Sequence, residues 1–210
     1  MILFLLILTA LSGVFFYRIK SSPLDKPIVY NSNKNVPTFQ ISPPKGWTFS
    51  ESSSIGNFNL VDINSSIKTF KDKDGDYTYS ANIDVSIIEE SAGTDLDSLV
   101  TKYKGLIENS SGQISFLKDE RVTVNGQKGR VLEFVDTPTR SSLEKAIKEV
   151  GLVNEDLEWH LTQKVHKLYY FFLVDGFLYA VSGISLNQHW AEFETETRSS
   201  LNSFKLLNLL

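Results

Sequence analysis

The sequence predicts an α+β fold in which an antiparallel β-sheet is covered by helices on both faces. The main observation is residues 161–204, which predict two long strands, a tight turn at Asp175-Gly176 and a closing amphipathic helix. Asp-Gly favours a type I′ turn, because both central positions of that turn need positive φ. The turn sets a register with four apolar pairs: Phe172–Tyr179, Tyr170–Val181, Phe171–Ala180 and Leu173–Leu178. Both faces of the hairpin are therefore apolar and need cover, which predicts an α/β/α sandwich.

Composition is typical of one globular domain. The 210 residues are 41% hydrophobic and 22% charged, which is sufficient for a sizeable core. There is no cysteine, so neither a disulfide framework nor a lipid-modified cysteine is available. Without residues 1–20, which hold two of the 21 basic residues and no acid, 19 basic residues face 25 acidic ones and the net charge is −6. A mildly acidic domain repels polyanions, which argues against nucleic-acid binding.

The apolar N-terminus predicts a membrane anchor. Residues 1–17 carry no charge, and a helix of that length covers ~25 Å at ~1.5 Å per residue, slightly less than the ~30 Å hydrocarbon core of a bilayer. A signal peptide is the alternative, because Ala10, Leu11 and Ser12 offer a small-residue cleavage site. No basic residue precedes the apolar run, however, so we expect residues 1–20 to form an uncleaved transmembrane helix.

A flexible spacer is predicted next, over residues 21–36, which are rich in Ser, Asn and Pro and show no hydrophobic period. The globular domain then covers residues 37–210. It opens with a short strand at residues 38–41, after which two prolines and a glycine predict a turn. Trp47 and Phe49 return the chain to the core.

Three further segments alternate between apolar and polar residues and predict strands at 58–63, 67–70 and 77–88. The last two are joined by residues 71–76, where aspartates at alternate positions resemble a calcium loop, since such carboxylates can converge on one hard cation. The spacing fails, because glycine falls at the fourth position rather than the sixth and Ile83 stands where a bidentate glutamate is needed. A solvated hairpin turn is the better interpretation.

A helix is predicted from the capping box variant Thr94-Asp-Leu-Asp97, which also places acidic residues at the positive helix end. Apolar residues then recur at helical spacing and form one stripe that can cover a sheet face: Leu96, Leu99, Val100, Tyr103, Leu106 and Ile107. A second hairpin follows at 113–124 and 129–135 around Asn125-Gly126, which tolerates positive φ. The spacing from Gly126 to Gly129 resembles a nucleic-acid-clamping loop only superficially, because that loop joins helices and this one joins strands.

Residues 136–158 predict a helical insertion between strands. Ser141-Ser-Leu-Glu144 is a capping box, a short apolar stripe follows it, and Gly151 suits the position after a helix end. A recognition surface is expected at such a rim insertion, with a passive excursion as the alternative. The last helix is predicted to begin after Asn187 as its N-cap and to present one apolar side: Trp190, Phe193, Thr197, Leu201 and Phe204.

No catalytic, cofactor-binding or metal-binding set emerges from the sequence. His160 and His166 share a predicted strand face but lie about 20 Å apart at ~3.3 Å per residue, too far to ligate one metal. No nucleophile elbow, phosphate loop, His-Glu-x-x-His motif or cysteine nucleophile is present, and the adjacent carboxylates of Glu89 and Glu90 are interpreted as loop solvation. We therefore predict a protein that is not an enzyme and needs neither cofactor nor metal. Side chains that converge only in space would leave no local signature.

Four motifs, in this order, resemble the PsbP-like family: Pro44-Lys45-Gly46-Trp47, Leu96-x-x-Leu99, Val124-Asn-Gly-Gln-Lys-Gly-Arg130 and Ser200-Leu-Asn-Ser-Phe204. The resemblance covers residues 37–206. It implies the Mog1/PsbP α/β/α sandwich, which is common in exported or membrane-anchored proteins without known catalysis. In photosynthetic members the domain is a luminal extrinsic subunit of photosystem II. The segment 136–158 departs from the compact family pattern, so the resemblance implies no particular partner and no binding residue.

Two functions stay open on this sequence. The first is a non-enzymatic, membrane-tethered, extracytoplasmic module of the cell envelope that binds or assembles with a protein partner. The alternative is a small-ligand carrier or enzyme with a pocket between sheet and helix. Aromatic residues that would line such an opening are Tyr77, Tyr79, Trp159 and Tyr169.

The location of the domain follows from opposing signals. Arg18 and Lys20 favour a cytoplasmic domain, because positive charge beside an anchor tends to stay inside. The polar spacer and the family resemblance favour the opposite side. We expect a single-pass anchor in the cell membrane with the globular domain outside the cytoplasm.

Overall fold

The computed structural model describes residues 27–30, 38–52, 59–65, 68–72, 75–90, 93–110, 112–141, 143–144 and 161–207. The strands are β1 (Ile28–Tyr30), β2 (Phe39–Ile41), β3 (Thr48–Ser52), β4 (Asn59–Asn64), β5 (Lys68–Asp72), β6 (Gly75–Tyr79), β7 (Asn82–Glu89), β8 (Gln113–Val124), β9 (Gln127–Thr137), β10 (Val165–Val174), β11 (Phe177–Leu186) and β12 (Lys205–Leu206). The helices are α2 (Leu96–Ser110), the 3₁₀ helix η3 (Asn187–His189) and α5 (Trp190–Ser203).

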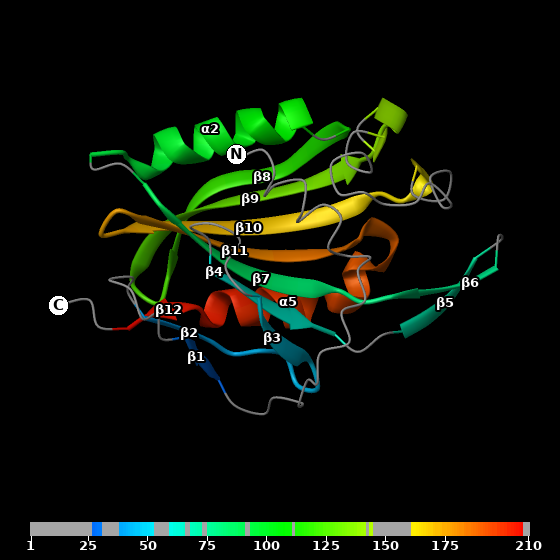
Figure 1. Cartoon of the computed structure of the whole chain (residues 1–210), viewed down its shortest axis with the longest axis horizontal. Coiled ribbons are helices and arrows are strands. Elements are labelled where there is room, and N and C mark those ends of the chain that lie inside the picture. Colours follow the sequence, from blue (N-terminus) through cyan, green and yellow to red (C-terminus); the bar gives the residue numbers. More distant parts are fainter. Residues whose placement is uncertain are drawn as a thin grey trace.

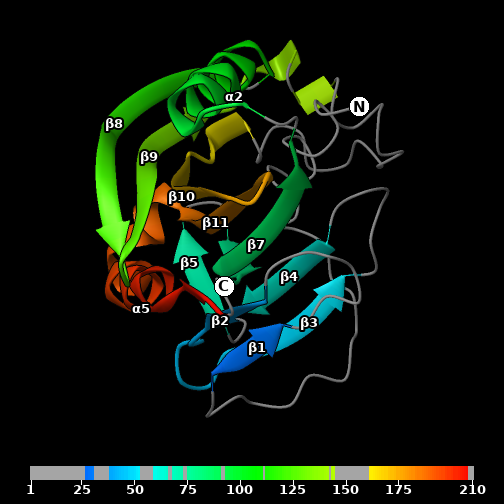
Figure 2. The same cartoon turned by 90° about the vertical axis from the view of Figure 1, so that its left-hand side faces the viewer.

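A seven-stranded antiparallel sheet in the order β3-β4-β7-β11-β10-β9-β8 forms the main layer. Helix α2 packs on β8, β9 and β10, whereas α5 packs on β11 and on β2 of a smaller sheet. Figures 1 and 2 show the two helices on opposite sides, with β8 and β9 curving around α5. The predicted antiparallel sheet with helices on both faces is therefore confirmed for the described residues.

The predicted central hairpin is confirmed in its register. Strands β10 and β11 pair as expected, including Phe172 with Tyr179 and Phe171 with Ala180. The turn residues Asp175 and Gly176 have φ values of 51° and 78°, which is the positive-φ geometry that Asp-Gly favours. The second predicted hairpin is confirmed in the same way by β8, β9 and the turn at Asn125-Gly126.

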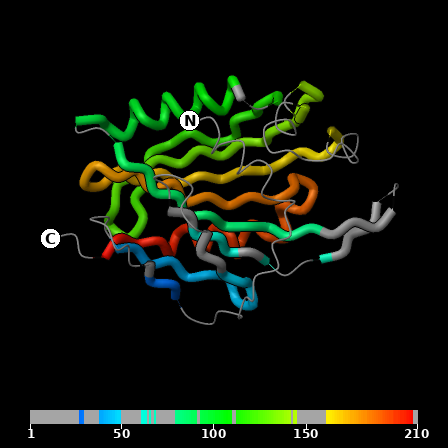
Figure 3. The backbone as a smooth tube through the Cα atoms, viewed as in Figure 1, coloured from blue at the N-terminus to red at the C-terminus, as the bar shows by residue number. Residues whose placement is uncertain are grey.

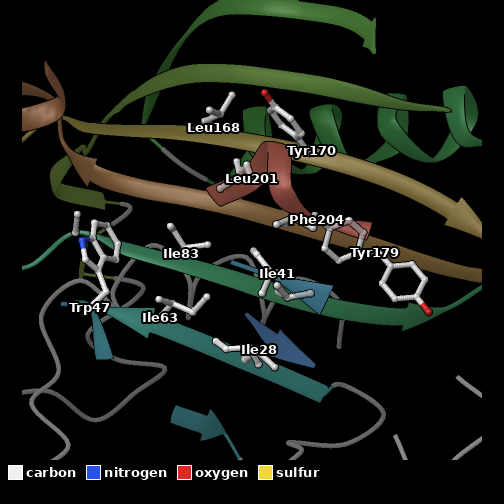
Figure 4. Packing of buried hydrophobic residues seen from close by; sticks show 14 of the residues in the cluster. Ile28, Ile41, Trp47, Ile63, Ile83, Leu168, Tyr170, Tyr179, Leu201 and Phe204 are labelled. Carbon is white, nitrogen blue, oxygen red and sulfur yellow. The ribbon is translucent and has the colours of Figure 1, made fainter. Parts of the chain in front are cut away.

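Two hydrophobic clusters lie on the two faces of the sheet. Under α2, Leu99, Tyr103 and Ile107 pack with Phe171, and Tyr169 and Phe171 stack at 5.7 Å between ring centroids. On the other face, Trp190, Phe193 and Leu201 of α5 pack with strand residues in a larger cluster, which also includes the residues labelled in Figure 4. Trp47 is buried there, as predicted, and its indole nitrogen donates a hydrogen bond to Glu196. The helices thus cover the sheet through side chains that the predicted apolar stripes supplied.

A close approach at Gly183 lets α5 lie against β11. A methyl group added at Gly183 would collide with Cγ2 of Thr197, while the next nearest atoms would stay at ordinary contact distance. We expect Gly183→Ala to lower the free energy of unfolding by about 1–3 kcal/mol, a typical cost of overpacking. Thr197→Ser removes Cγ2, so the double variant is expected to recover most of this loss in urea unfolding. Equal destabilisation with and without Thr197→Ser would contradict this account.

The segment 77–88, predicted as one strand, is two strands in the structure. Strand β6 pairs with β5, and β7 pairs with β4 and β11. At the break, Ser65 N donates to Ala81 O, and Ala81 N donates to Ser65 Oγ, both at 2.9 Å. Because Ala81 bonds to the connection after β4 rather than to a strand, the chain changes partners there. In Figure 1 the β5–β6 hairpin extends beyond the main sheet.

Part of the predicted spacer 21–36 is a strand. Residues Ile28–Tyr30 form β1, which pairs with β2, and β2 also pairs with β12. Figure 3 shows this small sheet, in which the N-terminal end of the described chain, blue, and its C-terminal end, red, lie on either side of β2. The physical reason is that Ile28-Val-Tyr30 is a run of good strand formers and that Ile28 is buried in the larger cluster. The spacer prediction is wrong for these three residues.

Two helix starts differ from prediction. Helix α2 is capped by Asp95 rather than Thr94, since Asp95 accepts hydrogen bonds from both the backbone nitrogen and the hydroxyl of Ser98. Asn187 is not the N-cap of α5, because it begins η3 and its Oδ1 lies 3.3 Å from Nδ1 of His166. The Asn187 side chain therefore lies against His166 and does not cap α5. His189 is the residue at the N-cap position, and its side chain makes no capping hydrogen bond.

The predicted insertion 136–158 is described only in part. Strand β9 continues to Thr137, so the strand ends two residues later than predicted, and helical backbone appears at residues 140–141 and 143–144. Residues 145–160 and the predicted anchor, 1–20, lie outside the described residues. Among the residues that are described, no helix has the length and apolar character needed to cross a membrane.

Candidate functional site

One half of the sheet face that carries α2 is polar. Along β7, Ile83, Val85 and Ile87 belong to the cluster on the α5 face, so the alternating residues Asn82, Asp84 and Ser86 point to the α2 face. Although polar, these three side chains are buried. On the neighbouring strands Asp62 and Ser182 pair with Asp84 and lie on the same face. We call Asp62, Asn82, Asp84, Ser86 and Ser182 the polar region.

Two carboxyl groups meet in the polar region. Asp62 of β4 and Asp84 of β7 are direct cross-strand partners, and Asp84 is only 2% exposed. Asn82 Nδ2 donates to Asp84 Oδ1 at 2.8 Å. Asp84 Oδ2 receives no N–H or O–H group, because its neighbour Asp62 also has only acceptors when ionised. A proton on either carboxyl would supply the missing donor.

The electrostatics of this pair favour protonation. Burial raises the pKa of Asp84 well above its ordinary value, and the charge and hydrogen bonding of Asp62 raise it further. The hydrogen bond from Asn82 acts in the opposite direction but is the weaker effect. Burial also raises the pKa of Asp62. The polar region therefore holds two acids that are not both readily ionised.

A second polar group lies on the same face, toward the predicted insertion. Lys167 Nζ lies 3.0 Å from Asp136 Oδ2, and both side chains are almost fully buried. The ammonium group also lies 5.8 Å from the ring centre of Phe134. Within the described part of the chain, Asp136 Oδ1 and Gln163 Oε1 are buried without a hydrogen-bond partner. The buried ammonium group of Lys167 is therefore paired with the carboxylate of Asp136.

A third group lies under α5 on the opposite face. Glu133 Oε1 accepts a hydrogen bond from Arg198 at 2.6 Å and lies 2.9 Å from His166 Nε2. Burial would raise the pKa of Glu133, but the hydrogen bond with His166 and the charge of Arg198 together lower it. The His166 ring stacks on Trp190 at 4.0 Å. These contacts tie α5 to β9 and β10, which is a structural role.

Surface charges fix α2 in a similar way. Arg130 bridges Asp97 of the helix and Asp119 of β8, at 2.7 and 2.6 Å. Arg121 and Lys104 extend this network with ion pairs to Asp97 and Asp119, respectively. The hydrogen bonds from Arg121 and Arg130 lower the pKa of Asp97. Because the network is largely exposed, its contribution to stability is modest.

The residues considered for chemistry from the sequence do not assemble into one site. Tyr79 is buried in the α5-side cluster and Tyr169 in the α2-side cluster, so these two do not line a common opening. His166 is buried as described, and His189 Nδ1 lies 2.8 Å from Glu192. Trp159, His160 and the Tyr77 side chain lie outside what the structure describes. Across the described ranges, no three His, Asp or Glu side chains form a metal-binding group.

The predicted turn at residues 71–76 is consistent with the structure. Lys71 pairs with Asp76 and Asp72 with Gly75 in the β5–β6 hairpin. The hairpin interpretation of this segment is confirmed at the level of the backbone.

Comparison with known proteins gives structural neighbours only. No family profile and no curated protein matches the sequence. Similar solved structures include cyanobacterial PsbP (CyanoP) from Synechocystis sp. PCC 6803, at 15% identity, 76% coverage of this chain, 92% coverage of that chain and a TM-score of 0.42. LpqN, involved in cell envelope biogenesis of Mycobacterium tuberculosis, matches at 11% identity, 86% and 90% coverage and a TM-score of 0.47.

The Ran-binding protein Mog1p of Saccharomyces cerevisiae matches at 11% identity, 88% and 96% coverage and a TM-score of 0.46. PsbP, LpqN and Mog1 share the Mog1/PsbP-like fold. The neighbours thus include both namesakes of the fold that the sequence resemblance implied. At these identities and TM-scores the likeness is no guide to function.

Proposed function

We propose that this protein is a non-enzymatic, membrane-tethered, extracytoplasmic module that binds or assembles with a protein partner of the cell envelope. The observation that carries this proposal is the filling of both sheet–helix interfaces by large side chains. Phe171 and Tyr103 occupy the space under α2, and Trp190 and Phe193 occupy the space under α5. A ligand pocket between sheet and helix would need that space, so the rims and edges of the sandwich are the surfaces left for recognition.

Photocrosslinking in native membranes tests the proposed partner. A photoreactive residue replaces Arg140, which is exposed where the chain leaves β9, and in a matched control it replaces Lys102 on the outer side of α2. A single discrete adduct from position 140 and none from position 102 is expected. The same adducts from both positions, or none under conditions that capture known envelope complexes, would count against a binding rim.

A reporter fused after Leu210 tests the proposed location. Activity of a reporter that works only outside the cytoplasm is expected for the full chain. Activity only of a cytoplasm-specific reporter would place the domain inside the cell and overturn this part of the proposal.

The polar region favours a second candidate function, a small-ligand carrier. Among the described residues, three buried acceptor oxygens receive no hydrogen bond: Asp84 Oδ2 and Asp136 Oδ1 on the α2 face of the sheet, and Gln163 Oε1 just before β10. A ligand rich in N–H or O–H donors would satisfy them. Melting curves in the presence of amines and polyols test this candidate, since a ligand bound to the folded state must raise the melting temperature. No shift at millimolar concentration would rule it out for those classes.

A further inference from the structure

A single junction joins β3 and β4 to the rest of the main sheet. In the order β3-β4-β7-β11, β4 is hydrogen-bonded to β7 on one side and to β3, at the sheet edge, on the other. The β4–β7 ladder runs from the pair Asn59–Ile87 to the pair Asn64–Asn82. Asp62 and Asp84 face each other inside this ladder. A change in the interaction of these two carboxyls therefore acts directly on the contact that holds the β3–β4 edge.

The described elements around the pair supply no compensating positive charge. Facing Asp84, β11 provides Ser182, and β7 itself provides Asn82. One strand farther, β10 provides Tyr169, which pairs with Ser182, and its basic residue Lys167 is engaged by Asp136. A nearby cation would lower the pKa of Asp84, but the one group that lowers it is the neutral amide of Asn82, whereas burial and Asp62 raise it. Two ionised carboxylates placed directly opposite each other would destabilise the ladder.

We propose that Asp62 and Asp84 share one proton across the β4–β7 junction, and that loss of this proton with rising pH loosens the junction and the β3–β4 edge. The shared proton gives Asp84 Oδ2 the donor that it lacks in the ionised pair. It also leaves one negative charge instead of two. The proposal concerns a device within the fold and is independent of the proposed binding function.

The direction of the pH dependence follows from linkage. An unperturbed Asp has a pKa of about 3.9 in the unfolded chain, and the folded values of Asp62 and Asp84 are raised. The folded state therefore binds more protons, so its stability is greatest at low pH and declines as pH rises from about 4 to the folded pKa. For one proton, the equilibrium constant for opening grows by up to about tenfold per pH unit in this window. Above the folded pKa the loss is complete.

Other carboxyls titrate in the opposite sense. The pKa values of Glu133, Asp97 and Asp119 are lowered in the fold, so they favour the folded state above their unfolded values and lose this effect toward acid. Their contribution changes below about pH 5, where the unfolded groups become protonated. Measurements between pH 5 and pH 8 therefore avoid the titration of these carboxyls, and comparison with Asp84→Asn removes the contribution of the histidines, which also titrate in this range.

Native-state hydrogen exchange of the full chain tests the proposal. Amides of β4 and β7 in the wild type are expected to be at least tenfold more protected at pH 5 than at pH 8, after correction for intrinsic exchange. In Asp84→Asn, the amide group replaces the shared proton as a donor to Asp62, so protection should be the same at both pH values. Asp119→Asn, on the exposed side of β8, is the matched control and should behave as the wild type.

A second variant guards against a folding defect. Asp62→Asn leaves Asp84 and its bond from Asn82 in place. It should weaken the pH dependence without abolishing it, because the charge of Asp62 is removed but Asp84 stays buried. Equal wild-type protection at pH 5 and pH 8, or a pH dependence as large as that of the wild type in both variants, would overturn the proposal. Restored wild-type protection at pH 8 on adding calcium or magnesium chloride, without effect on Asp84→Asn, would also overturn it, because a bound cation rather than a proton would then neutralise the pair.

Discussion

Lys167→Met is expected to lower the free energy of unfolding by about 3–5 kcal/mol at neutral pH, the usual effect of breaking a buried ion pair on one side. The substitution keeps a long side chain of similar volume but removes the ammonium group that lies 3.0 Å from Asp136. Asp136 would then stay buried without the cation that it pairs with, and among the described residues its Oδ1 already lacks a hydrogen-bond partner. Urea unfolding followed by circular dichroism measures the loss.

The matched control replaces both partners. Lys167→Met combined with Asp136→Leu removes the unpaired charge and leaves apolar groups of similar size, so most of the lost stability should return. A double variant as unstable as Lys167→Met alone would show that packing of the lysine stem, rather than its charge, is responsible. If the loss of unfolding free energy in the double variant equals the sum of the losses in the two single variants, the charges of Lys167 and Asp136 do not stabilise each other, and packing is again responsible.

Phe171→Ala and Phe172→Ala are each expected to lower the free energy of unfolding by about 3–5 kcal/mol, as for other buried phenylalanines. The two rings are adjacent in sequence, fully buried and on opposite faces of the sheet. Phe171 lies 5.7 Å from the Tyr103 ring of α2, whereas Phe172 stacks on Phe204 at 5.2 Å. Each substitution should therefore leave a cavity under a different helix.

Hydrogen exchange separates the two effects. Phe171→Ala should reduce protection mainly in α2, and Phe172→Ala should reduce it mainly in α5. Leu117→Ala, at an exposed position of β8, is the control and should change stability by less than about 0.5 kcal/mol. Equal loss of protection in both helices from either phenylalanine would contradict two separately packed faces.

Local signals predicted the central hairpins correctly. Asp175-Gly176 and Asn125-Gly126 adopt positive φ in short turns, and this geometry fixes which residues face each other. Helix α2 was also predicted, because its apolar residues recur every three or four positions, and this spacing is visible in the local sequence. Its cap was displaced by one residue, since Thr94 and Asp95 are both good N-caps and only the backbone geometry selects one.

The polar region was missed for a physical reason. Alternation along β7 was read correctly as a strand, but alternating polar residues usually indicate a solvated face. Asn82, Asp84 and Ser86 are instead buried. The partner of Asp84 is Asp62 on another strand, and no local pattern links the two. The pair is recognised only in the structure, where Asp62 and Asp84 lie opposite each other on neighbouring strands and both have raised pKa values.

The sequence alone determined the two-faced hairpin around Asp175-Gly176, the helices that cover it and the antiparallel character of the sheet. These follow from turn geometry and from periods of two and 3.6 residues, which act over short distances along the chain. Only the tertiary structure decided that the strand after β6 changes partners, that residues Ile28–Tyr30 join a second sheet, and that Lys167 meets Asp136 while Asp62 meets Asp84. Pairings between distant segments depend on the burial and charge of the whole assembly, which no single segment encodes.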